Sequence, residues 1–275
     1  MDVAVIGATG KVGRRVATRL AQQGVSVRAA SRRPEGPAEG IRGVRFDWTD
    51  PSTWRDVAEG ADAIFVVGPI AQPDPGRTLG DFLAVSDAPS VVLLSSLATE
   101  PGDGSPNGAM EEAVVESGKR WTILRASWFM QNFSENPAFT RVLAERDEIP
   151  AAVGDVAISF VDTGDIADMA IAVLTDPRWE GRAYGVTGPE ALTLTDAAEH
   201  LSKGLDRRIT YENRSPREAA EVITATGVPE PVVAVLGFVD SVTRTGAFAP
   251  VSDDVRAVLG RPPATFADYA ASLEV

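Results

Sequence analysis

Short apolar runs alternate with helix-like stretches along the first half of the chain. The runs that we predict as strands are Asp2–Ile6, Val25–Ala30, Val44–Phe46, Ala63–Val67, Val91–Leu94 and Thr122–Leu124. Helical patterns lie between most of them, at Val12–Gln23, Pro51–Ala58, Arg77–Ser86 and Ala109–Glu116. Strands that alternate with helices form βαβ units, so the pattern predicts a parallel sheet with helices on both faces.

The pattern is looser beyond about residue 135. We predict strands at Ile158–Val161, Ala183–Val186 and Ile209–Glu212, helices at Asp165–Leu174 and Thr195–Gly204, an interruption at Pro229–Pro231, and a last helical stretch after Pro262-Pro263. The predicted fold is therefore α/β, with a doubly wound Rossmann-type domain at residues 1–150 and a smaller α+β substrate-binding lobe at residues 151–275. Residues 158–188 are expected to return to the main sheet.

The first predicted strand runs directly into a glycine-rich turn, Gly7-Ala8-Thr9-Gly10-Lys11-Val12-Gly13, and a helix follows. Such a turn lets the backbone approach a pyrophosphate, which the amides of the helix N-terminus then bind. The position between strand and helix favours a dinucleotide site over an ordinary turn more than the glycines alone do. Gly13 is followed by Arg14, not by the Lys and Ser or Thr of a P-loop, which argues against a nucleotide triphosphatase.

The end of the second strand indicates which dinucleotide is bound. An NAD site usually carries Asp or Glu there, bonded to the ribose hydroxyls. This chain has Ser31-Arg32-Arg33-Pro34 instead, so no carboxylate repels a 2′-phosphate and two guanidinium groups would bind one. The alternative is a solvated basic loop. On a chain with a net charge of −13, this placement of basic residues favours NADP(H).

Three more segments would complete a cofactor groove. Asp47 follows the third strand and either accepts a hydrogen bond from the adenine amine or caps the turn before Pro51. Gly68-Pro69 follows the fourth strand, where small residues let the backbone pass the middle of the dinucleotide. Ser95-Ser96 ends the fifth strand, at the carboxyl edge where ligands bind in doubly wound sheets.

Composition excludes several kinds of site and partner. The chain has no cysteine and one histidine, His200, so we predict no disulfide and no metal site. Its acidic character argues against nucleic-acid binding. No apolar run approaches the roughly 20 residues that span a bilayer, and no signal-peptide pattern precedes the first strand. We expect a cytoplasmic protein, monomeric or homodimeric, with a small-molecule substrate and no membrane partner.

Several motifs of the chain resemble those of the NmrA-like branch of the atypical short-chain dehydrogenases. The resemblance spans nearly the whole chain and rests on 7–13, 31–34, 121–125, 127–133, 160–162, 165–167, 184–188, 253–255, 260–263 and 266–267. Phe46-Asp47-Trp48 with Asp50-Pro51 and Trp54 is similar to the subgroup that includes festuclavine-type dehydrogenases and bacterial quinone reductases. The resemblance implies a Rossmann domain that binds NADP(H) and a C-terminal lobe that closes over the substrate.

The resemblance also implies roles for individual residues. The glycine-rich turn would line the pyrophosphate, the arginine pair the 2′-phosphate, and the ends of the fourth and fifth strands the nicotinamide ribose. The predicted cofactor-binding residues are Gly7, Thr9, Gly10, Lys11, Val12, Gly13, Ser31, Arg32, Arg33, Asp47, Gly68, Pro69, Ser95, Ser96 and Arg125. The predicted substrate pocket is an apolar wall of Trp128, Phe129, Met130, Phe133 and Phe160, for which ordinary core packing is the alternative.

The usual catalytic pair of a short-chain dehydrogenase, Tyr-x-x-x-Lys, is absent from this chain. Four residues after Tyr184, Tyr211 and Tyr269 stand Gly188, Ser215 and Leu273. Many bacterial relatives carry His-x-x-x-Glu on the helix in question; if Glu112 matches that glutamate, Gly108 stands at the histidine position. The acid/base candidates that remain are Ser96, Glu112 or its neighbour Glu111, and Lys119. Each has a plainer interpretation, as a cofactor contact, a helix-face charge and an exposed lysine.

An acceptor that needs no strong enzyme acid agrees best with these residues. Quinones, iminium ions, activated alkenes and carbonyls accept hydride and take a proton from water, while the protein orients them and excludes solvent. We therefore predict an enzyme, an NADPH-dependent oxidoreductase of a small, flat or conjugated molecule. Two alternatives stay open: a redox-sensing NADP(H)-binding regulator without turnover, and a non-redox isomerase or cyclase-type enzyme on the same fold.

Overall fold

The structure is a computed structural model that describes residues 1–33, 41–100 and 102–273 of the 275-residue chain. Contacts divide the chain into two compact units. The first comprises Met1–Ala126, Thr163–Val186 and Arg256–Gly260, and the second Ser127–Asp162, Thr187–Val255 and Arg261–Val275. The expected boundary near residue 150 lies inside the second unit, and the segment expected to return to the sheet contributes residues 163–186 to the first.

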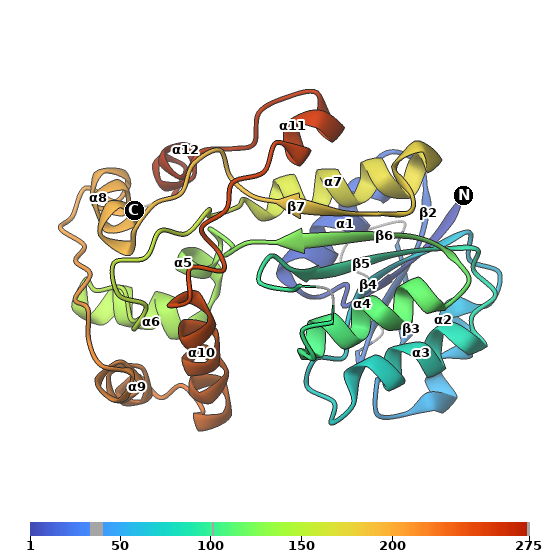
Figure 1. Ribbon diagram of the computed structural model, residues 1–275, viewed down its shortest axis with the longest axis horizontal. Helices are drawn as coiled ribbons and strands as arrows, with labels where there is room; N and C mark the ends of the chain where they lie inside the picture. The colour runs from blue at the N-terminus through green and yellow to red at the C-terminus, as the bar shows by residue number, and fades with distance from the viewer. Residues whose placement is uncertain (34–40, 101, 274–275) are drawn as a thin grey trace. The chain divides into compact units, whose positions relative to one another are not determined.

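The first unit is built on a seven-stranded parallel sheet (Figure 1). Its strands are β1 (Asp2–Ile6), β2 (Ser26–Ser31), β3 (Ile41–Arg45), β4 (Ala63–Val67), β5 (Ser90–Ser96), β6 (Arg120–Ala126) and β7 (Arg182–Val186), in the order β3-β2-β1-β4-β5-β6-β7. The direction of strand addition reverses between β1 and β4, the switch point beside which such sheets bind ligands. The doubly wound Rossmann-type fold expected from the sequence is confirmed.

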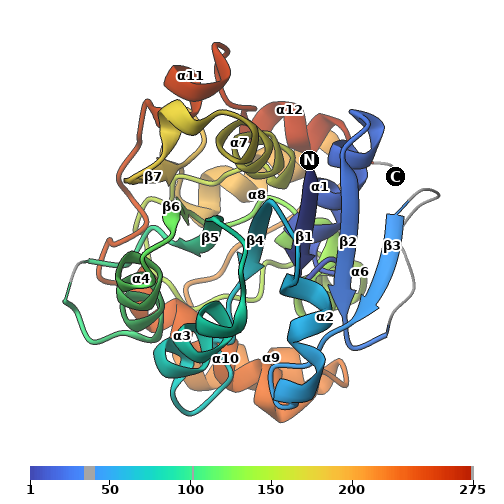
Figure 2. The same ribbon diagram turned by 90° about the vertical axis from the view of Figure 1, so that its right-hand side faces the viewer.

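Helices cover both faces of this sheet (Figure 2). The helices on one face are α1 (Lys11–Gln22) and α7 (Thr163–Thr175), and those on the other are α2 (Arg55–Ala58), α3 (Pro75–Val85) and α4 (Pro106–Glu116). The short 3-10 helices η1 (Pro51–Thr53) and η2 (Pro177–Trp179) complete the unit, together with part of α11 (Asp254–Leu259). Because both faces are covered, the central strands β1 and β4 are almost continuously apolar, which explains why the sequence predicts these two closely.

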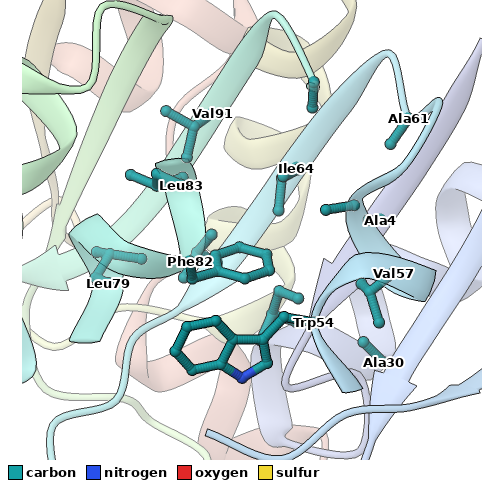
Figure 3. Close-up of a cluster of buried hydrophobic side chains, with 14 of the residues drawn as sticks. Ala4, Ala30, Trp54, Val57, Ala61, Ile64, Leu79, Phe82, Leu83 and Val91 are labelled. Carbon is teal, nitrogen blue, oxygen red and sulfur yellow. The ribbon is translucent and has the colours of Figure 1, made fainter. Parts of the chain in front are cut away.

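The core between the sheet and α2–α3 is shown in Figure 3. Phe82 is fully buried there and meets the ring of Trp54 edge-on, with the centroids 5.9 Å apart. Ile64, Leu79 and Leu83 fill the space around these rings. Burial of one such side chain contributes about 1.5–3 kcal/mol, so this cluster stabilises the sheet edge from which the polar residues described below extend.

The described part of the second unit is helical. Its helices are α5 (Asn132–Glu135), α6 (Pro137–Arg146), α8 (Leu194–Gly204), α9 (Pro216–Ala225), α10 (Glu230–Thr243) and α12 (Phe266–Ala271). The strands predicted at Ile158–Val161 and Ile209–Glu212 do not form, and these segments make isolated bridges only. The expected α+β character was therefore wrong, because a short apolar run can equally be a buried irregular segment. The prolines at Pro229–Pro231 begin α10 instead of interrupting the chain, since a helix tolerates proline in its first turn.

Candidate functional site

The glycine-rich turn between β1 and α1 has a shape that side chains would prevent. Gly7 has a φ of +80°, and a Cβ added to it would lie 2.9 Å from Cβ of Val67. A Cβ on Gly13 would overlap the carbonyl oxygen of Gly7, so α1 approaches the turn backbone closely. Gly10 is different: its N–H donates to that carbonyl at 2.9 Å, and an added Cβ would meet only the same oxygen, at 3.3 Å. The turn therefore requires glycine at positions 7 and 13, whereas Gly10 leaves the outer surface of the turn without a side chain.

The N-terminus of α1 presents uncapped amide groups. Gly10 is the N-cap residue and supplies no side-chain cap, and the first turn carries no acidic residue. The first N–H groups of a helix lack helical acceptors and lie at the positive end of its dipole. Val12 and Gly13 are buried, so they offer backbone only, whereas Thr9 is exposed. These donors and the bare Gly10 surface fit the diphosphate of a dinucleotide.

Beside this turn lies a hollow of about 560 Å³, lined by Thr9, Ser31, Arg32 and Arg33. The hydroxyl of Ser31 donates to the carbonyl of Arg33 and so shapes the end of β2. Both arginines are exposed, and within residues 1–33, 41–100 and 102–273 neither forms an ion pair. The two guanidinium groups at this strand end fit a 2′-phosphate. Pro34, the last residue of the predicted motif, lies outside the described residues.

Asp47 closes the turn that follows β3. Its Oδ1 accepts hydrogen bonds from the backbone N–H and the hydroxyl of Thr49, at 2.9 and 2.8 Å. These bonds hold the pKa of the Asp47 carboxyl below its usual value, and the charges of Arg32 and Arg45 lower it further. The structure thus shows the turn-capping role of Asp47, while a contact with adenine stays a prediction.

Packing inside the protein also accounts for Gly68. A Cβ on this residue would overlap Sδ of Met110, which reaches the end of β4 from α4. Pro69 is buried beside it. Gly68 therefore lets Met110 of α4 pack closely against the end of β4, and the roles of Gly68 and Pro69 toward a cofactor stay predictions.

A buried polar network joins the carboxyl ends of β5 and β6 to α4. Ser95 and Arg125 are register neighbours, and Glu111 comes from α4. The Ser95 hydroxyl donates to Oε1 of Glu111 at 2.6 Å, and the Arg125 guanidinium donates to Oε1 through Nε at 3.0 Å and to Oε2 through Nη2 at 2.5 Å. The contact with Glu111 raises the pKa of Arg125. The guanidinium is thus a fixed cation at the sheet edge where ligands bind.

Two of the predicted acid/base candidates lie away from this network. Glu112 is exposed and lines a surface groove between α3 and α4. Lys119 precedes β6, so about 20 Å of strand separates it from the carboxyl edge. Its Nζ donates to the carbonyls of Ser86 and Ala88, and burial lowers its pKa. Ser96 lies at the correct edge, half-buried, with Oγ accepting from the N–H of Ala98.

The sequence leaves Glu111 and Glu112 open as the acid of this helix and aligns Glu112 with the family's glutamate, whereas the structure buries Glu111. Glu111 faces the sheet with Met110 and Val114, whereas Glu112 lies about 100° further round the helix. A signal for this pair is present in the sequence: Glu111 is an acid on the apolar face of the helix, and Arg125 stands in a buried strand. If Glu111 is the glutamate of the His-x-x-x-Glu pattern, the histidine position holds the half-buried Asn107 instead of Gly108.

The predicted substrate wall lies in the second unit and is mostly core. Trp128, Met130, Phe133 and Phe160 are buried. Phe133 and Phe160 stand 5.9 Å apart between ring centroids, Phe160 meets Phe266 at 5.0 Å, and Nε1 of Trp128 donates to Oγ1 of Thr243 at 3.0 Å. These contacts agree with the core-packing interpretation of Trp128, Phe133 and Phe160, and the role of the wall toward a substrate stays a prediction. Phe129 is half-buried, and its role toward a substrate stays a prediction.

Comparison with known proteins places this architecture in a family. Residues 7–177 match the NAD(P)H-binding family, and residues 108–269 match the NmrA-like family. The chain belongs to the NmrA-like family. Among its relatives, the chain is 34% identical to a (4-alkanoyl-5-oxo-2,5-dihydrofuran-3-yl)methyl phosphate reductase of Streptomyces griseus and 30% identical to an NAD(P)H azoreductase of Xenophilus azovorans. Each alignment covers 98% of this chain and 96% of the relative.

Solved structures of this NmrA-like fold include both a reductase and a regulator. An NADPH-dependent quinone oxidoreductase from Escherichia coli, complexed with NADPH, matches with a TM-score of 0.83 at 24% identity, over 98% of this chain and 99% of that one. The negative transcriptional regulator NmrA, in complex with NAD, matches with a TM-score of 0.75 at 18% identity, over 99% and 94%. At these identities the likeness establishes the fold. In the described part of the chain, no helix has the length and apolar character to cross a membrane.

Proposed function

We propose that this NmrA-like protein is an NADPH-dependent reductase of a small conjugated acceptor and works without a Tyr–Lys pair. The observation that carries the proposal is the adjacency of two anion sites: the uncapped N-terminus of α1, and the hollow lined by Thr9, Ser31, Arg32 and Arg33. A dinucleotide with a 2′-phosphate presents anions to both. The names of two relatives, an NAD(P)H azoreductase and an NADPH-dependent quinone oxidoreductase, agree with this function.

The residues of the chain would divide the work between binding and orientation. NADPH, when bound, supplies the hydride. The amides at the start of α1 would hold its diphosphate, and Arg32 with Arg33 would hold its 2′-phosphate. Ser96, at the carboxyl end of β5, would contact the nicotinamide ribose. Orientation of acceptor and donor in a site from which water is excluded supplies the remaining catalysis.

The test is a calorimetric titration of the wild type and of the Arg32→Ala/Arg33→Ala variant with NADPH and NADH. Each lost charge-assisted bond is worth about 1.5–3 kcal/mol, so NADPH affinity should fall by roughly 10²-fold or more, while NADH affinity stays unchanged. The matched control is Arg55→Ala/Arg77→Ala, which removes two exposed arginines from α2 and α3. Equal losses for both cofactors would exclude the 2′-phosphate assignment.

A second candidate function is that of a dinucleotide-binding regulator. It is favoured by the fold shared with the NmrA regulator and by the placement of Glu112 and Lys119 away from the carboxyl sheet edge. The two functions differ in turnover. Oxidation of NADPH in the presence of quinones, enones or iminium compounds would support the reductase, whereas tight NADPH binding without oxidation by any acceptor would support the regulator.

A further inference from the structure

The guanidinium of Arg125 is hydrogen-bonded through two of its three nitrogens. Its Nε and Nη2 are bound to the carboxylate of Glu111, whereas Nη1 has no hydrogen-bond partner among the residues that the structure describes. The side chain is 22% exposed, and its partner Glu111 is 8% exposed. The bound half of the fork is therefore buried and fixed, and the other half is available to a ligand.

The network holds this donor in place. The Glu111 carboxylate is fully occupied, because Ser95 also donates to it from the neighbouring strand. A planar guanidinium held bidentately loses little freedom when its remaining N–H groups bind a ligand. Nη1 is thus a preorganised N–H donor at the carboxyl end of β6, one residue before the strand ends at Ala126.

We propose that Nη1 of Arg125 binds the acceptor oxygen on which negative charge develops, so that the protein reduces quinones, enones and related conjugated carbonyls in preference to cationic acceptors. This inference rests on the proposed reductase function. Hydride forms a new C–H bond at the acceptor carbon as the C–H bond of the dihydronicotinamide breaks. The π electron pair of the acceptor moves onto its oxygen, beside Arg125, and the oxyanion then takes a proton from water.

The charges around Arg125 agree with this selectivity. The guanidinium does not release its proton, because contact with Glu111 raises its pKa, so it acts as a fixed donor and not as an acid. The charges of Glu100 and Asp103 also raise the pKa of Arg125, but both residues are exposed, and water and salt screen their charges. A cationic iminium or triarylmethyl carbon at Nη1 would instead meet an N–H of like charge.

The test compares two acceptors, 1,4-benzoquinone and a cationic triarylmethane dye, with NADPH as the reductant. The wild type should reduce the quinone with the higher kcat/KM. Loss of one oxyanion donor typically lowers the rate by about 10²–10³-fold, so kcat/KM of Arg125→Met should fall by that factor with the quinone and by far less with the dye. The calorimetric Kd for NADPH is measured for both proteins, because a weaker cofactor complex lowers the rates with both acceptors alike, whereas loss of the donor lowers the rate with the quinone alone. Arg125→Lys, which keeps a cation, should recover part of the quinone activity.

A binding measurement tests the same donor without turnover. 4-Nitrophenol is added to the NADP+ complex, and its ionisation is followed by the visible absorbance of the phenolate. When it is bound to the wild type, the phenol should ionise at a lower pH than when it is free in water. Arg125→Met should lose this shift, and Arg125→Lys should keep part of it. A purely structural role of Arg125 would not move the ionisation of a ligand.

Two further variants separate chemistry from folding. Arg125→Met leaves the buried carboxylate of Glu111 without its partner, which is strongly destabilising. The double variant Arg125→Met/Glu111→Gln removes both charges, so it lacks the donor without leaving an unpaired buried charge. The matched control is Arg120→Met, on the same strand at its amino end, where Arg120 pairs with Glu180 at 2.6 Å. Its activity with both acceptors should equal that of the wild type.

The outcomes distinguish this inference from the proposed function. Equal losses with quinone and dye, or a phenol shift that survives Arg125→Met, would overturn the role of Arg125 while leaving the reductase intact. A wild type that binds NADPH but reduces neither acceptor would overturn the proposed reductase. In that case the phenol titration still decides whether Arg125 binds an oxyanion.

Discussion

The two units supply hydrogen-bond partners to their buried backbone groups in different ways. In the first unit, strand ladders pair the backbone, so Ser95, Glu111 and Arg125 are left to bind one another at the sheet edge. In the second unit, side chains hold the buried irregular segment 149–154. Asp240 accepts from the N–H of Ala152 at 2.7 Å, and the hydroxyl of Tyr211 accepts from the N–H of Gly154 at 3.1 Å.

This difference has a general physical cause. Every buried N–H and C=O needs a partner, and regular sheet supplies partners from the backbone itself. Side chains beside a sheet are then available for ligands, whereas the polar side chains around an irregular segment are occupied. The comparison therefore predicts that ligand chemistry concentrates in the first unit and that substitutions in the second act mainly on stability.

The largest effect should come from Gly13→Ala in the glycine-rich turn. The new Cβ would overlap the Gly7 carbonyl oxygen, which is backbone and cannot move aside cheaply. We expect loss of both NADPH and NADH binding and a large fall in thermal stability, measured by calorimetry. Gly80→Ala is the matched control, because its Cβ would lie 3.8 Å from Ala113; helix propensity predicts a gain of about 1 kcal/mol there. Equal behaviour of the two variants would contradict the close approach of α1.

The next effect should come from Phe133→Ala in the aromatic core of the second unit. Phe133 is buried against Phe139, Phe160 and Phe266, so its truncation should lower the free energy of unfolding by about 3–5 kcal/mol. NADPH affinity, measured below the melting temperature, should not change. The control is Phe238→Ala, which removes a side chain that is 61% exposed and should shift stability by about 0.5 kcal/mol or less. A large change in the NADPH affinity of the folded Phe133→Ala variant would contradict the prediction that substitutions in the second unit act mainly on stability.

The smallest effect concerns Asp240 and depends on pH. Burial raises the pKa of Asp240 to about 6, above its value in an unfolded chain of about 3.9. The native state therefore holds the proton more tightly, so this contribution to stability is complete below about pH 4 and is lost as the pH rises through about 6.

Asp240→Asn tests this linkage, because its amide oxygen still accepts from Ala152 while the charge is gone. The variant should be more stable than the wild type at pH 7, by about 1–3 kcal/mol, and the difference should vanish near pH 4. Urea unfolding at both pH values measures it. A difference that does not change with pH would contradict the assigned titration.

Prediction from sequence succeeded where local pattern and structure coincide. Strands β1 and β4 match the predicted ranges at every residue, since each is an apolar run bounded by polar or glycine residues. The predicted elements do not include α9, although Ser215 and Glu218 form a capping box at its start, or α10, where Pro229–Pro231 begins a helix instead of interrupting the chain. These are errors of interpretation, because the signals are present in the chain.

Other features lie beyond any local pattern. Adjacent acids on one helix differ by about 100° in direction, and only packing against β5 and β6 buries Glu111 while Glu112 faces water. Likewise, nothing in the spacing of Trp128, Phe133 and Phe160 distinguishes a ligand wall from a core. The contacts that decide both cases join residues far apart in the chain.

The sequence by itself determined the sheet, the glycine-rich turn and the cluster of basic residues after β2, because each depends on neighbours within a few residues. It also determined the family. The tertiary structure alone decided that Glu111, Ser95 and Arg125 form one network, that Lys119 lies at the opposite sheet edge, and that the aromatic residues fill a core. Burial and strand register control these arrangements, and both arise only when distant segments pack together.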